Sequence, residues 1–444
     1  MPLKRRAIVW FRQDLRLSDN EALSDALAQA FEVIPVYVFD TRVFRGSTEY
    51  GFAKTGPYRA SFILESVKNL QRSLRKLGSD LIIRIGRPEE EIFSIAQQVK
   101  SNWVFCNRER TPEEVFVQDQ LERKLWSIGQ ELRFSRGKML YHTGDLPFPI
   151  QHTPDTFSQF KKEVERYVSV REPLPAPQRS FNIISTDVDP GIMPDLKDFG
   201  HESVQIDRRA DYRFKGGEKE ALKRLKEYFE NEKAVLNYKD TKDELSGTDF
   251  TSKLSPYLAQ GCISPKQFYA ALKEFEARHG ESKSSEDLFH QLMYRDFLRF
   301  MVKKYGNIVF DKGGITERPL DNLSDDARRF EKWANGKTGV PMIDAGMNEF
   351  RQTGYISNRI RQNLASYLVH ELEVNWQWGA SFFESLLIDY DVCSNWMNWN
   401  AIAGLTQDPK DETILNPSAQ ATRYDPRSEY IEKWSRAQRS IKLV

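Results

Sequence analysis

The run AIVWF at Ala7–Phe11 and the run VIPVYVF at Val33–Phe39 set the fold class of the N-terminal part of this 444-residue chain. Two similar runs follow, LIIRI at Leu81–Ile85 and WVFC at Trp103–Cys106. Short, continuous apolar runs that are rich in β-branched and aromatic residues are typical of strands buried on both faces. The four runs therefore predict a buried β-sheet.

Segments with helical spacing of apolar residues alternate with these runs, at Arg59–Leu77 and Pro112–Trp126. The second segment has Thr111 as its expected N-cap and a proline at its first helical position. Strand–helix alternation indicates a doubly wound parallel sheet, which we place in an α/β domain at residues 1–135. Such sheets bind ligands at the carboxyl ends of their strands. No GxGxxG motif follows the first strand, so the usual dinucleotide fingerprint is absent.

The sequence pattern of the rest of the chain changes at residue 136 and again at residue 216. Residues 136–215 are rich in Pro, Asp and Ser, as in PLPAP at Pro173–Pro177, and this composition predicts a long surface connector. Residues 216–444 show helical periodicity without a convincing strand, which predicts an all-α domain. Two apolar helix faces support this prediction: Ala221, Leu222, Leu225, Tyr228 and Phe229 in one helix, and Ile360, Leu364, Tyr367, Leu368 and Leu372 in another.

The composition narrows the class of protein. The net charge is +1, so a nucleic-acid surface would need locally sorted charge. Cys106, Cys262 and Cys393 form no CxxC pair, which indicates neither a zinc site nor a disulfide framework. No apolar signal segment follows MPLKRR, and no run approaches the roughly 18 apolar residues of a membrane span. We expect a cytoplasmic or other intracellular protein.

The segment IDYDVCSNWMNWNAIAG, at Ile388–Gly404, is the strongest candidate site. It places the carboxylates of Asp389 and Asp391 and the amide of Asn395 among large aromatic side chains. This mixture suits a flat heteroaromatic ring with hydrogen-bonding edges, such as the isoalloxazine of a flavin. The alternative is an Asn-rich structural turn.

The segment YISNRIR, at Tyr355–Arg361, provides a cation for the same region. Asn358 and Arg361 are three residues apart and share a helix face. A buried Arg361 needs a carboxylate partner, and both Asp389 and Asp391 are candidates. The alternative is an exposed ion pair that contributes little to stability.

Two other segments suit anions or aromatic rings. GTDFTSKLSPYLAQGCIS, at Gly247–Ser264, clusters hydroxyl groups before a helix start, which predicts either an anion site or a plain helix cap. QLMYRDFLRF, at Gln291–Phe300, places Arg295 and Arg299 on one helix face beside aromatic residues. The alternative for this second segment is an amphipathic core helix with solvated arginines.

In this order, the segments resemble the photolyase/cryptochrome family, and within it the DASH-type cryptochromes. The resemblance covers nearly the whole chain. It is carried by WFRQDLRLSDN (Trp10–Asn20), GFAKTGPYR (Gly51–Arg59), DLPF (Asp145–Phe148), FKGGE (Phe214–Glu218), GKTGVPMIDAGM (Gly336–Met347), SNRIRQN (Ser357–Asn363) and LIDYDVCSNW (Leu387–Trp396).

The resemblance implies an N-terminal α/β domain and a helical domain that holds FAD. The residues implied to hold the diphosphate and ribityl chain are Tyr238, Thr251, Ser252, Lys253, Leu254 and Ser255. Those implied to line the flavin are Arg295, Asn358, Arg361, Asp389, Asp391 and Asn395, with an ion pair between Arg361 and Asp389. Asn395 would face flavin N5 and govern its protonation and redox state.

The resemblance also implies partners. Repair members of the family use light to split cyclobutane pyrimidine dimers, which are flipped out of DNA, and DASH-type members resemble photolyases that favour single-stranded DNA. Lys161, Lys162 and Arg359 would contribute to a positive groove for that strand. Many members carry a methenyltetrahydrofolate antenna, for which Glu109 is the best-matched contact.

Several positions depart from the family pattern. Trp399 and Trp376 match the two tryptophans nearest the flavin in the photoreduction chain, but the outermost position is Leu323, unless Trp378, Trp396 or a tyrosine takes its place. At the lesion, a glutamate is replaced by Gln291, which cannot transfer a proton, and aromatic positions hold Tyr294 and Ala401. A usual tryptophan is Tyr257.

Three functions therefore stay open. The first is an enzyme, a deoxyribodipyrimidine photolyase of the DASH type that acts on single-stranded DNA. The second is a non-repairing blue-light photoreceptor, which the altered lesion positions favour. The third is a dark flavin oxidoreductase, which no nicotinamide fingerprint supports.

Overall fold

A five-stranded parallel sheet is the centre of the N-terminal domain in the computed structural model, which describes residues 5–178, 188–408 and 414–435. The strand order is β3-β2-β1-β4-β5. The strands are β1 (Arg6–Phe11), β2 (Glu32–Asp40), β3 (Ile82–Gly86), β4 (Trp103–Asn107) and β5 (Glu131–Ser135). This order confirms the doubly wound α/β fold that the sequence predicts.

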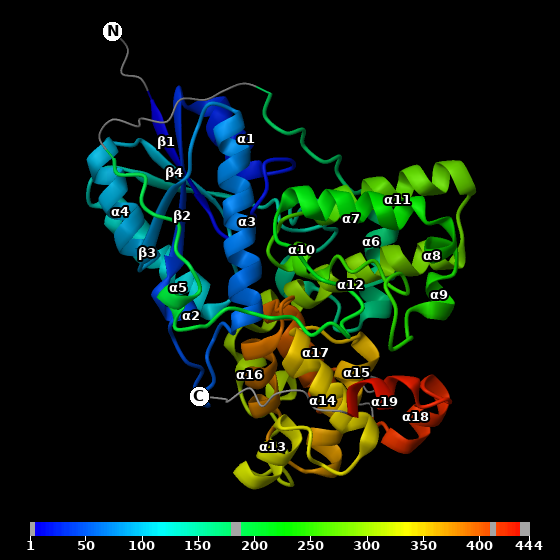
Figure 1. Ribbon diagram of the computed structural model, residues 1–444. Coiled ribbons are helices and arrows are strands. Elements are labelled where there is room, and N and C mark those ends of the chain that lie inside the picture. Colours follow the sequence, from blue (N-terminus) through cyan, green and yellow to red (C-terminus); the bar gives the residue numbers. More distant parts are fainter. Residues whose placement is uncertain (1–4, 179–187, 409–413, 436–444) are drawn as a thin grey trace.

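Helices cover both faces of the sheet because successive strand residues point to opposite sides. Ala7, Val9 and Phe11 of β1 pack in the core that contains α1 (Glu21–Gln29) and α3 (Pro57–Lys76). Ile8 and Trp10 face the other core, which contains α4 (Pro88–Val99) and α5 (Pro112–Trp126). Figure 1 shows α3 running between the sheet and the helical part of the molecule.

The four predicted strands and the two predicted helices of this domain are present. The strand β5 was not predicted, because its sequence ELRFS has only two apolar residues. Thr111 occupies the N-cap position of α5, but its side chain makes no capping bond. Its hydroxyl instead donates to the Glu114 carboxylate at 2.6 Å, so Thr111 is the predicted N-cap residue but does not cap with its side chain.

The segment 136–215 is more than a surface connector. It contains the helix α6 (Phe157–Tyr167). A short helix, α2 (Thr41–Phe44), lies earlier in the chain, within the α/β domain. In α6, Phe160 and Val164 are fully buried, and Phe160 packs against Phe297 at a ring distance of 5.3 Å. The expectation of a connector missed this helix, because two buried residues make a weak helical pattern.

From residue 216 onward the described chain forms helices, and no strand follows β5 in the described ranges, which confirms the helical domain. The helices are α7 (Glu218–Glu230), α8 (Glu232–Leu236), α9 (Tyr238–Thr241), α10 (Ser255–Ala259), α11 (Pro265–His279), α12 (Lys283–Tyr305), α13 (Ala327–Ala334), α14 (Pro341–Thr353), α15 (Asn358–Ser366), α16 (Trp376–Leu386), α17 (Val392–Ile402), α18 (Pro417–Tyr424) and α19 (Glu429–Ser435). Leu222 of α7 is 38% exposed and does not belong to the apolar face predicted for it.

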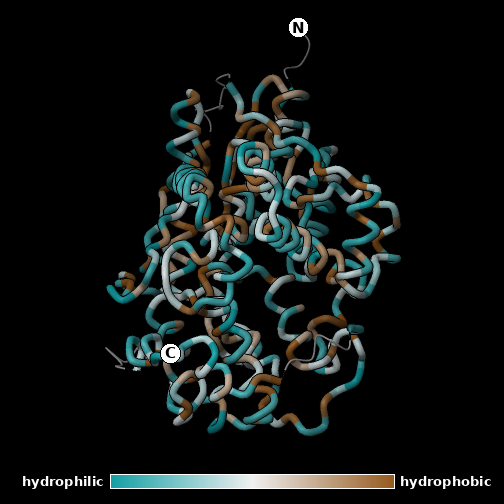
Figure 2. The backbone as a smooth tube through the Cα atoms, turned by 90° about the vertical axis from the view of Figure 1, so that its right-hand side faces the viewer, coloured by the Kyte–Doolittle hydropathy of each residue, from teal (hydrophilic) through white to brown (hydrophobic). Residues whose placement is uncertain are grey.

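The two domains share one hydrophobic core. Hydrophobic and hydrophilic residues alternate along the helices (Figure 2), and their apolar sides join the α1–α3 face of the sheet. Phe62 of α3 meets Tyr257 of α10 edge to face at 5.3 Å. Gly261 follows α10 with φ +65°, and a Cβ there would lie 2.2 Å from the Gln13 carbonyl oxygen, so this close approach requires glycine.

Within the described ranges, no helix is both long and apolar enough to cross a lipid bilayer.

Candidate functional site

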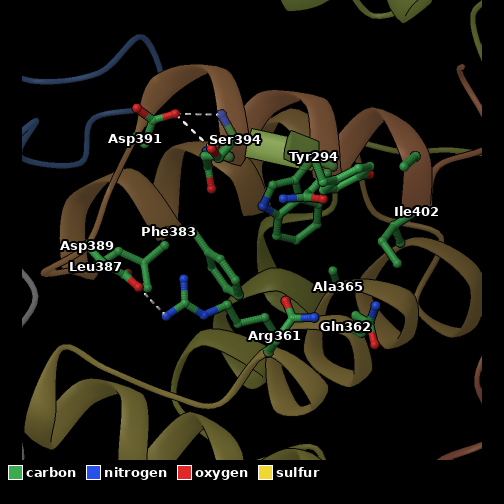
Figure 3. A pocket seen from close by; sticks show the side chains of 15 residues that line it. Tyr294, Arg361, Gln362, Ala365, Phe383, Leu387, Asp389, Asp391, Ser394 and Ile402 are labelled. Atoms are coloured by element: carbon green, nitrogen blue, oxygen red, sulfur yellow. Dashed lines mark hydrogen bonds and ion pairs between the residues drawn. The ribbon is translucent and has the colours of Figure 1, made fainter. Parts of the chain in front are cut away.

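A pocket opens among α12, α15, α16 and α17, and it holds about 870 Å³ of free space up to its mouth. Figure 3 shows its side chains converging from these helices. The lining residues are Tyr294, Asn358, Arg361, Gln362, Ala365, Phe383, Leu387, Asp389, Asp391, Ser394, Asn395, Asn398, Trp399, Ala401 and Ile402.

An ion pair between Arg361 and Asp389 crosses one side of the pocket (Figure 3), with Arg361 Nη2 2.8 Å from Asp389 Oδ2. The Ser255 hydroxyl donates to the same carboxylate oxygen at 2.6 Å. Burial opposes the charge of Arg361, but the adjacent Asp389 raises its pKa. This is the ion pair that the resemblance implied.

The second oxygen of Asp389, Oδ1, is buried and has no hydrogen-bond partner among the residues that the structure describes. A buried acceptor without a partner costs free energy, so its presence indicates that a ligand donates to it. Phe383, Leu387 and Trp399 add apolar walls to the same pocket. A flat ring with N–H groups at its edge fits this combination.

Asp391 has a different partner. It caps α17 by accepting from the Ser394 backbone N–H at 2.9 Å, and its carboxylate pairs with Arg299 of α12. Burial opposes its ionisation, but Arg299 and Arg295 hold its pKa well below the ordinary range. Of the two candidates that the sequence left open for Arg361, the structure therefore selects Asp389.

Arg295 lies next to the pocket without lining it. Its guanidinium donates to the backbone carbonyl oxygens of Lys138 at 3.2 Å and Leu258 at 3.3 Å. Burial and the nearby Arg299 lower its pKa to about 10. Arg295 therefore fixes α12 against the segments around Lys138 and Leu258, while the exposed Asn358 lines the pocket from the start of α15.

Asn395 and Trp399 lie on the same helix, α17, and both line the pocket. The Asn395 side-chain amide donates to the Ala380 carbonyl oxygen at 3.0 Å, which leaves its own carbonyl oxygen to accept from a ligand. Trp399 packs against α16, where a Cβ at Gly379 would lie 2.2 Å from its ring. The close packing of α16 on Trp399 thus depends on this glycine.

Trp376, the second tryptophan of the implied electron chain, is buried and does not line the pocket. Its indole N–H donates to the Lys312 carbonyl oxygen at 3.1 Å. Its ring meets Trp396 edge to face at 5.7 Å. The partly buried Leu323 supplies no aromatic ring at the outermost position.

The implied diphosphate residues are not all brought into this pocket. Tyr238 and the segment 251–255 do not line it, and only Ser255 reaches it, through Asp389. The helix α10 that begins at Ser255 has five residues, with the buried Leu254 as its N-cap. Lys253 has φ 56°, and its ammonium lies 3.5 Å from the centre of the Phe250 ring. The diphosphate role of these residues stays a prediction.

Lys253 lies in a buried polar cluster with Glu349 of α14. Burial lowers the pKa of Lys253 to about 7 and raises the pKa of Glu349 to about 7. The hydroxyl of Tyr430, on α19, donates to Glu349 at 2.6 Å. The folded protein thus favours the uncharged form of Glu349 and loses stability as the pH rises from about 4.3 towards 7.

We expect Glu349→Gln to remove this pH dependence. Relative to the parent, the variant should gain about 2 kcal/mol of unfolding free energy between pH 5 and pH 8. Urea unfolding at both pH values measures the change, with the exposed Glu429→Gln as control. A difference between variant and parent that stays constant with pH would show that Glu349 is not the titrating group.

Of the residues implied to contact the lesion, some line the pocket and others do not. Tyr294 and Ala401 line the pocket, and Tyr294 packs edge to face on Phe157 at 5.0 Å. Gln291 is exposed on α12 and does not line it. Arg359 is paired with Asp243 at 2.8 Å, so its charge is partly neutralised.

Lys161, another residue implied to contribute to the DNA groove, also has an acidic partner, since its ammonium lies 3.9 Å from the Glu286 carboxylate. Lys162 is exposed on α6. A role for these side chains in binding DNA stays a prediction.

Glu109, the implied folate contact, is 4% exposed and pairs with the buried Lys138. Burial opposes its ionisation, but the Lys138 ammonium holds its pKa below the ordinary value. A second pocket lies at the carboxyl ends of β1 and β2, with about 1,720 Å³ of free space up to its mouth. Trp10, Arg42 and Gln260 are among its lining residues, and Glu109 is not.

The sequence alone missed some residues that line the first pocket. Phe383 and Leu387 had no signal, because a buried apolar residue in a helix ordinarily indicates core.

Comparison with known proteins links both domains to DNA photolyases and cryptochromes. Residues 7–178 match the family described as DNA photolyase, and residues 288–442 match the FAD binding domain of DNA photolyase. Cryptochrome DASH from Gloeobacter violaceus is 42% identical over 431 residues, 97% of this chain and 85% of the relative.

Solved structures extend the similarity. The cryptochrome of Synechocystis sp. has a TM-score of 0.93 and 40% identity, and the match covers 98% of this chain and 89% of that one. An archaeal photolyase from Sulfolobus tokodaii, solved with two FAD molecules, has a TM-score of 0.80 and 29% identity, with 97% and 90% of the two chains covered.

Proposed function

The chain belongs to the photolyase and cryptochrome family, among the DASH-type cryptochromes, and from this premise we propose that it binds FAD in the α15–α17 pocket and repairs cyclobutane pyrimidine dimers in single-stranded DNA under blue light. The observation that carries the FAD site is the buried Asp389, which pairs with Arg361 through one oxygen and keeps the other for a ligand. Bound FAD supplies a light-absorbing ring that exchanges single electrons.

Each pocket side chain has a separate task in this proposal. With FAD bound, Asp389 would accept a hydrogen bond from it through Oδ1, and Arg361 would hold that carboxylate in place. Asn395 would offer its side-chain carbonyl oxygen as an acceptor. Trp399, held by its packing on Gly379, would be the adjacent electron donor, and the apolar walls would exclude water, which strengthens polar contacts.

A dimer-repair assay tests the enzymatic part of the proposal. Reduced, FAD-containing protein is mixed with single-stranded oligonucleotides that carry a thymine dimer and is illuminated with blue light. We expect the dimers to disappear in light and to persist in darkness. If the FAD-containing protein leaves the dimers intact, the hypothesis of DNA repair is excluded, while the proposed photochemical site is unaffected.

The second candidate function is a blue-light photoreceptor that does not repair DNA. The lining of the pocket favours it, because Ala401 provides no ring against which a flipped base could stack. The exposed Gln291 and the Arg359–Asp243 ion pair offer little to a lesion or to its phosphates. Light-dependent flavin reduction without repair would support this function.

We expect Ala401→Tyr to strengthen binding of dimer-containing oligonucleotides by about tenfold, because stacking of one base on an aromatic ring contributes roughly 1–3 kcal/mol. Fluorescence titration measures the affinity, with an undamaged oligonucleotide of the same sequence as control. Equal gains for damaged and undamaged strands, or no gain, would show that the lesion does not bind beside residue 401. Adding Gln291→Glu tests whether an acid at that position raises repair further.

We also propose an antenna, with methenyltetrahydrofolate at Glu109 as the first candidate. The pocket at β1 and β2 is the alternative location, because Glu109 already pairs with Lys138. Near-UV absorbance beyond the flavin bands would support folate, and a second flavin released on denaturation would support the pocket.

Three buried cysteines without disulfide bonds favour a reducing intracellular compartment.

A further inference from the structure

An aromatic contact leads away from the pocket where the expected outer tryptophan is Leu323. Trp396 lies one helical turn before Trp399 on α17, which makes the two side chains neighbours on one face. Its ring also meets Trp376 edge to face at 5.7 Å. Electron transfer between rings slows steeply with distance, so this ring contact places Trp396 to exchange an electron with Trp376, while its position one helical turn before Trp399 makes it the next tryptophan along α17.

Trp396 has a phenol as its next neighbour. The indole N–H of Trp396 donates to the Tyr390 hydroxyl oxygen at 3.3 Å. Tyr390 is partly exposed at the turn between α16 and α17. A hole that arrives at Trp396 thus has an oxidisable side chain at contact distance, next to solvent.

The surroundings of Tyr390 govern where its proton goes. The Glu384 carboxylate of α16 lies beside the Tyr390 hydroxyl, and burial raises the pKa of this carboxylate. The buried Arg59 guanidinium stacks on the Tyr390 ring at 4.6 Å and donates to the Glu384 backbone carbonyl oxygen at 2.7 Å. A cation at that position opposes a positive charge on the phenol, so oxidation of Tyr390 requires loss of its proton, for which Glu384 is the adjacent base.

A second aromatic path runs from Trp399 in another direction. Its rings are Trp333, Phe330, Trp378 and Tyr50, with centroid distances of 6.5, 5.5, 5.3 and 5.9 Å from each ring to the next. This path includes Phe330, which is far harder to oxidise than tryptophan. The path through Trp396 is therefore favoured.

We propose that Tyr390 is the terminal electron donor of this protein, with Trp396 as relay and Glu384 as proton acceptor; the inference rests on the flavin photochemistry proposed above. With FAD bound, Trp399 would give up one electron, Trp396 would refill Trp399, and Tyr390 would refill Trp396. The O–H proton of Tyr390 moves to Glu384, which leaves a neutral tyrosyl radical and a neutral carboxylic acid. A soluble thiol then supplies one electron and loses a proton to water, and Glu384 returns its proton to Tyr390.

Electron paramagnetic resonance of the illuminated FAD-containing protein tests this assignment. We expect a tyrosyl signal that narrows when the protein is produced with ring-deuterated tyrosine and that is lost in Tyr390→Phe. The phenylalanine keeps the ring beneath Arg59 and removes only the hydroxyl. The matched control is Tyr50→Phe, which should keep the signal, and Glu384→Gln should slow its appearance while leaving Tyr390 in place.

A measurement that needs no light-excited flavin separates this inference from the proposed function. In pulse radiolysis, azide radicals oxidise tryptophans, and decay of the tryptophan radical into a tyrosyl radical within one molecule is followed by absorbance. We expect this decay in the parent protein and its loss in Tyr390→Phe. A tyrosyl signal that survives in Tyr390→Phe and disappears in Tyr50→Phe would overturn the inference. Transfer to Tyr390 in a protein whose flavin is not reduced by light would support the path and refute the proposed function alone.

Discussion

Replacing Asp389 by alanine is expected to leave the purified protein without FAD and to lower its unfolding free energy by about 3 kcal/mol. Arg361 would lose its only carboxylate partner among the described residues and stay 77% buried, since its side chain is 23% exposed. A buried charge without a partner is costly, which is why breaking such a pair destabilises more than the pair itself stabilises. The ring-edge acceptor would be lost in the same substitution.

The flavin-to-protein absorbance ratio after gel filtration measures FAD retention, and urea unfolding measures stability. Asp145→Ala is a matched control, because Asp145 pairs with Arg171 at 2.7 Å in an exposed ion pair. Such pairs contribute about 0–1 kcal/mol, and the control should keep its flavin. An Asp389→Ala protein that retains stoichiometric FAD would show that the ligand does not depend on this carboxylate.

Replacing Trp399 by phenylalanine is expected to abolish light-driven flavin reduction while FAD stays bound. The phenyl ring still fills space beside Phe383, which meets Trp399 edge to face at 5.1 Å. It removes the oxidisable indole that lines the pocket and contacts Trp333. This one substitution thus distinguishes loss of the electron donor from loss of FAD binding.

Flavin absorbance under anaerobic blue light with a soluble thiol measures this effect. The control is Trp126→Phe, because Trp126 is 64% exposed on α5 in the α/β domain. We expect the control to be reduced at the parental rate. Reduction of Trp399→Phe at that same rate would mean that electrons enter the pocket by another route.

Parts of the fold could be predicted because burial on both sides leaves a continuous apolar signal. The strands β1 to β4 have such runs, and the helix Pro112–Trp126 has proline and acidic residues at its start. The strand β5 lies at the sheet edge with Glu131 exposed, and only two of its five residues are apolar. The helix α6 was missed because only Phe160 and Val164 are buried along it.

The candidate site was predictable in its residue types and less so in its pairings. Helical spacing brought Asn358 and Arg361 to one face, but Asp389 and Asp391 are two residues apart and both suited Arg361. Only the position of α12, which brings Arg299 to Asp391, decides between them. The contact of Trp396 with Tyr390 likewise depends on the turn between α16 and α17, which no sequence pattern specifies.

The absorption spectrum of the purified protein, before and after anaerobic blue light, tests the flavin site most directly. We expect one flavin per chain, released as FAD on denaturation, and loss of the oxidised flavin bands under illumination with a soluble thiol. A folded protein that contains no flavin and takes up none from excess FAD would contradict the assignment of the α15–α17 pocket.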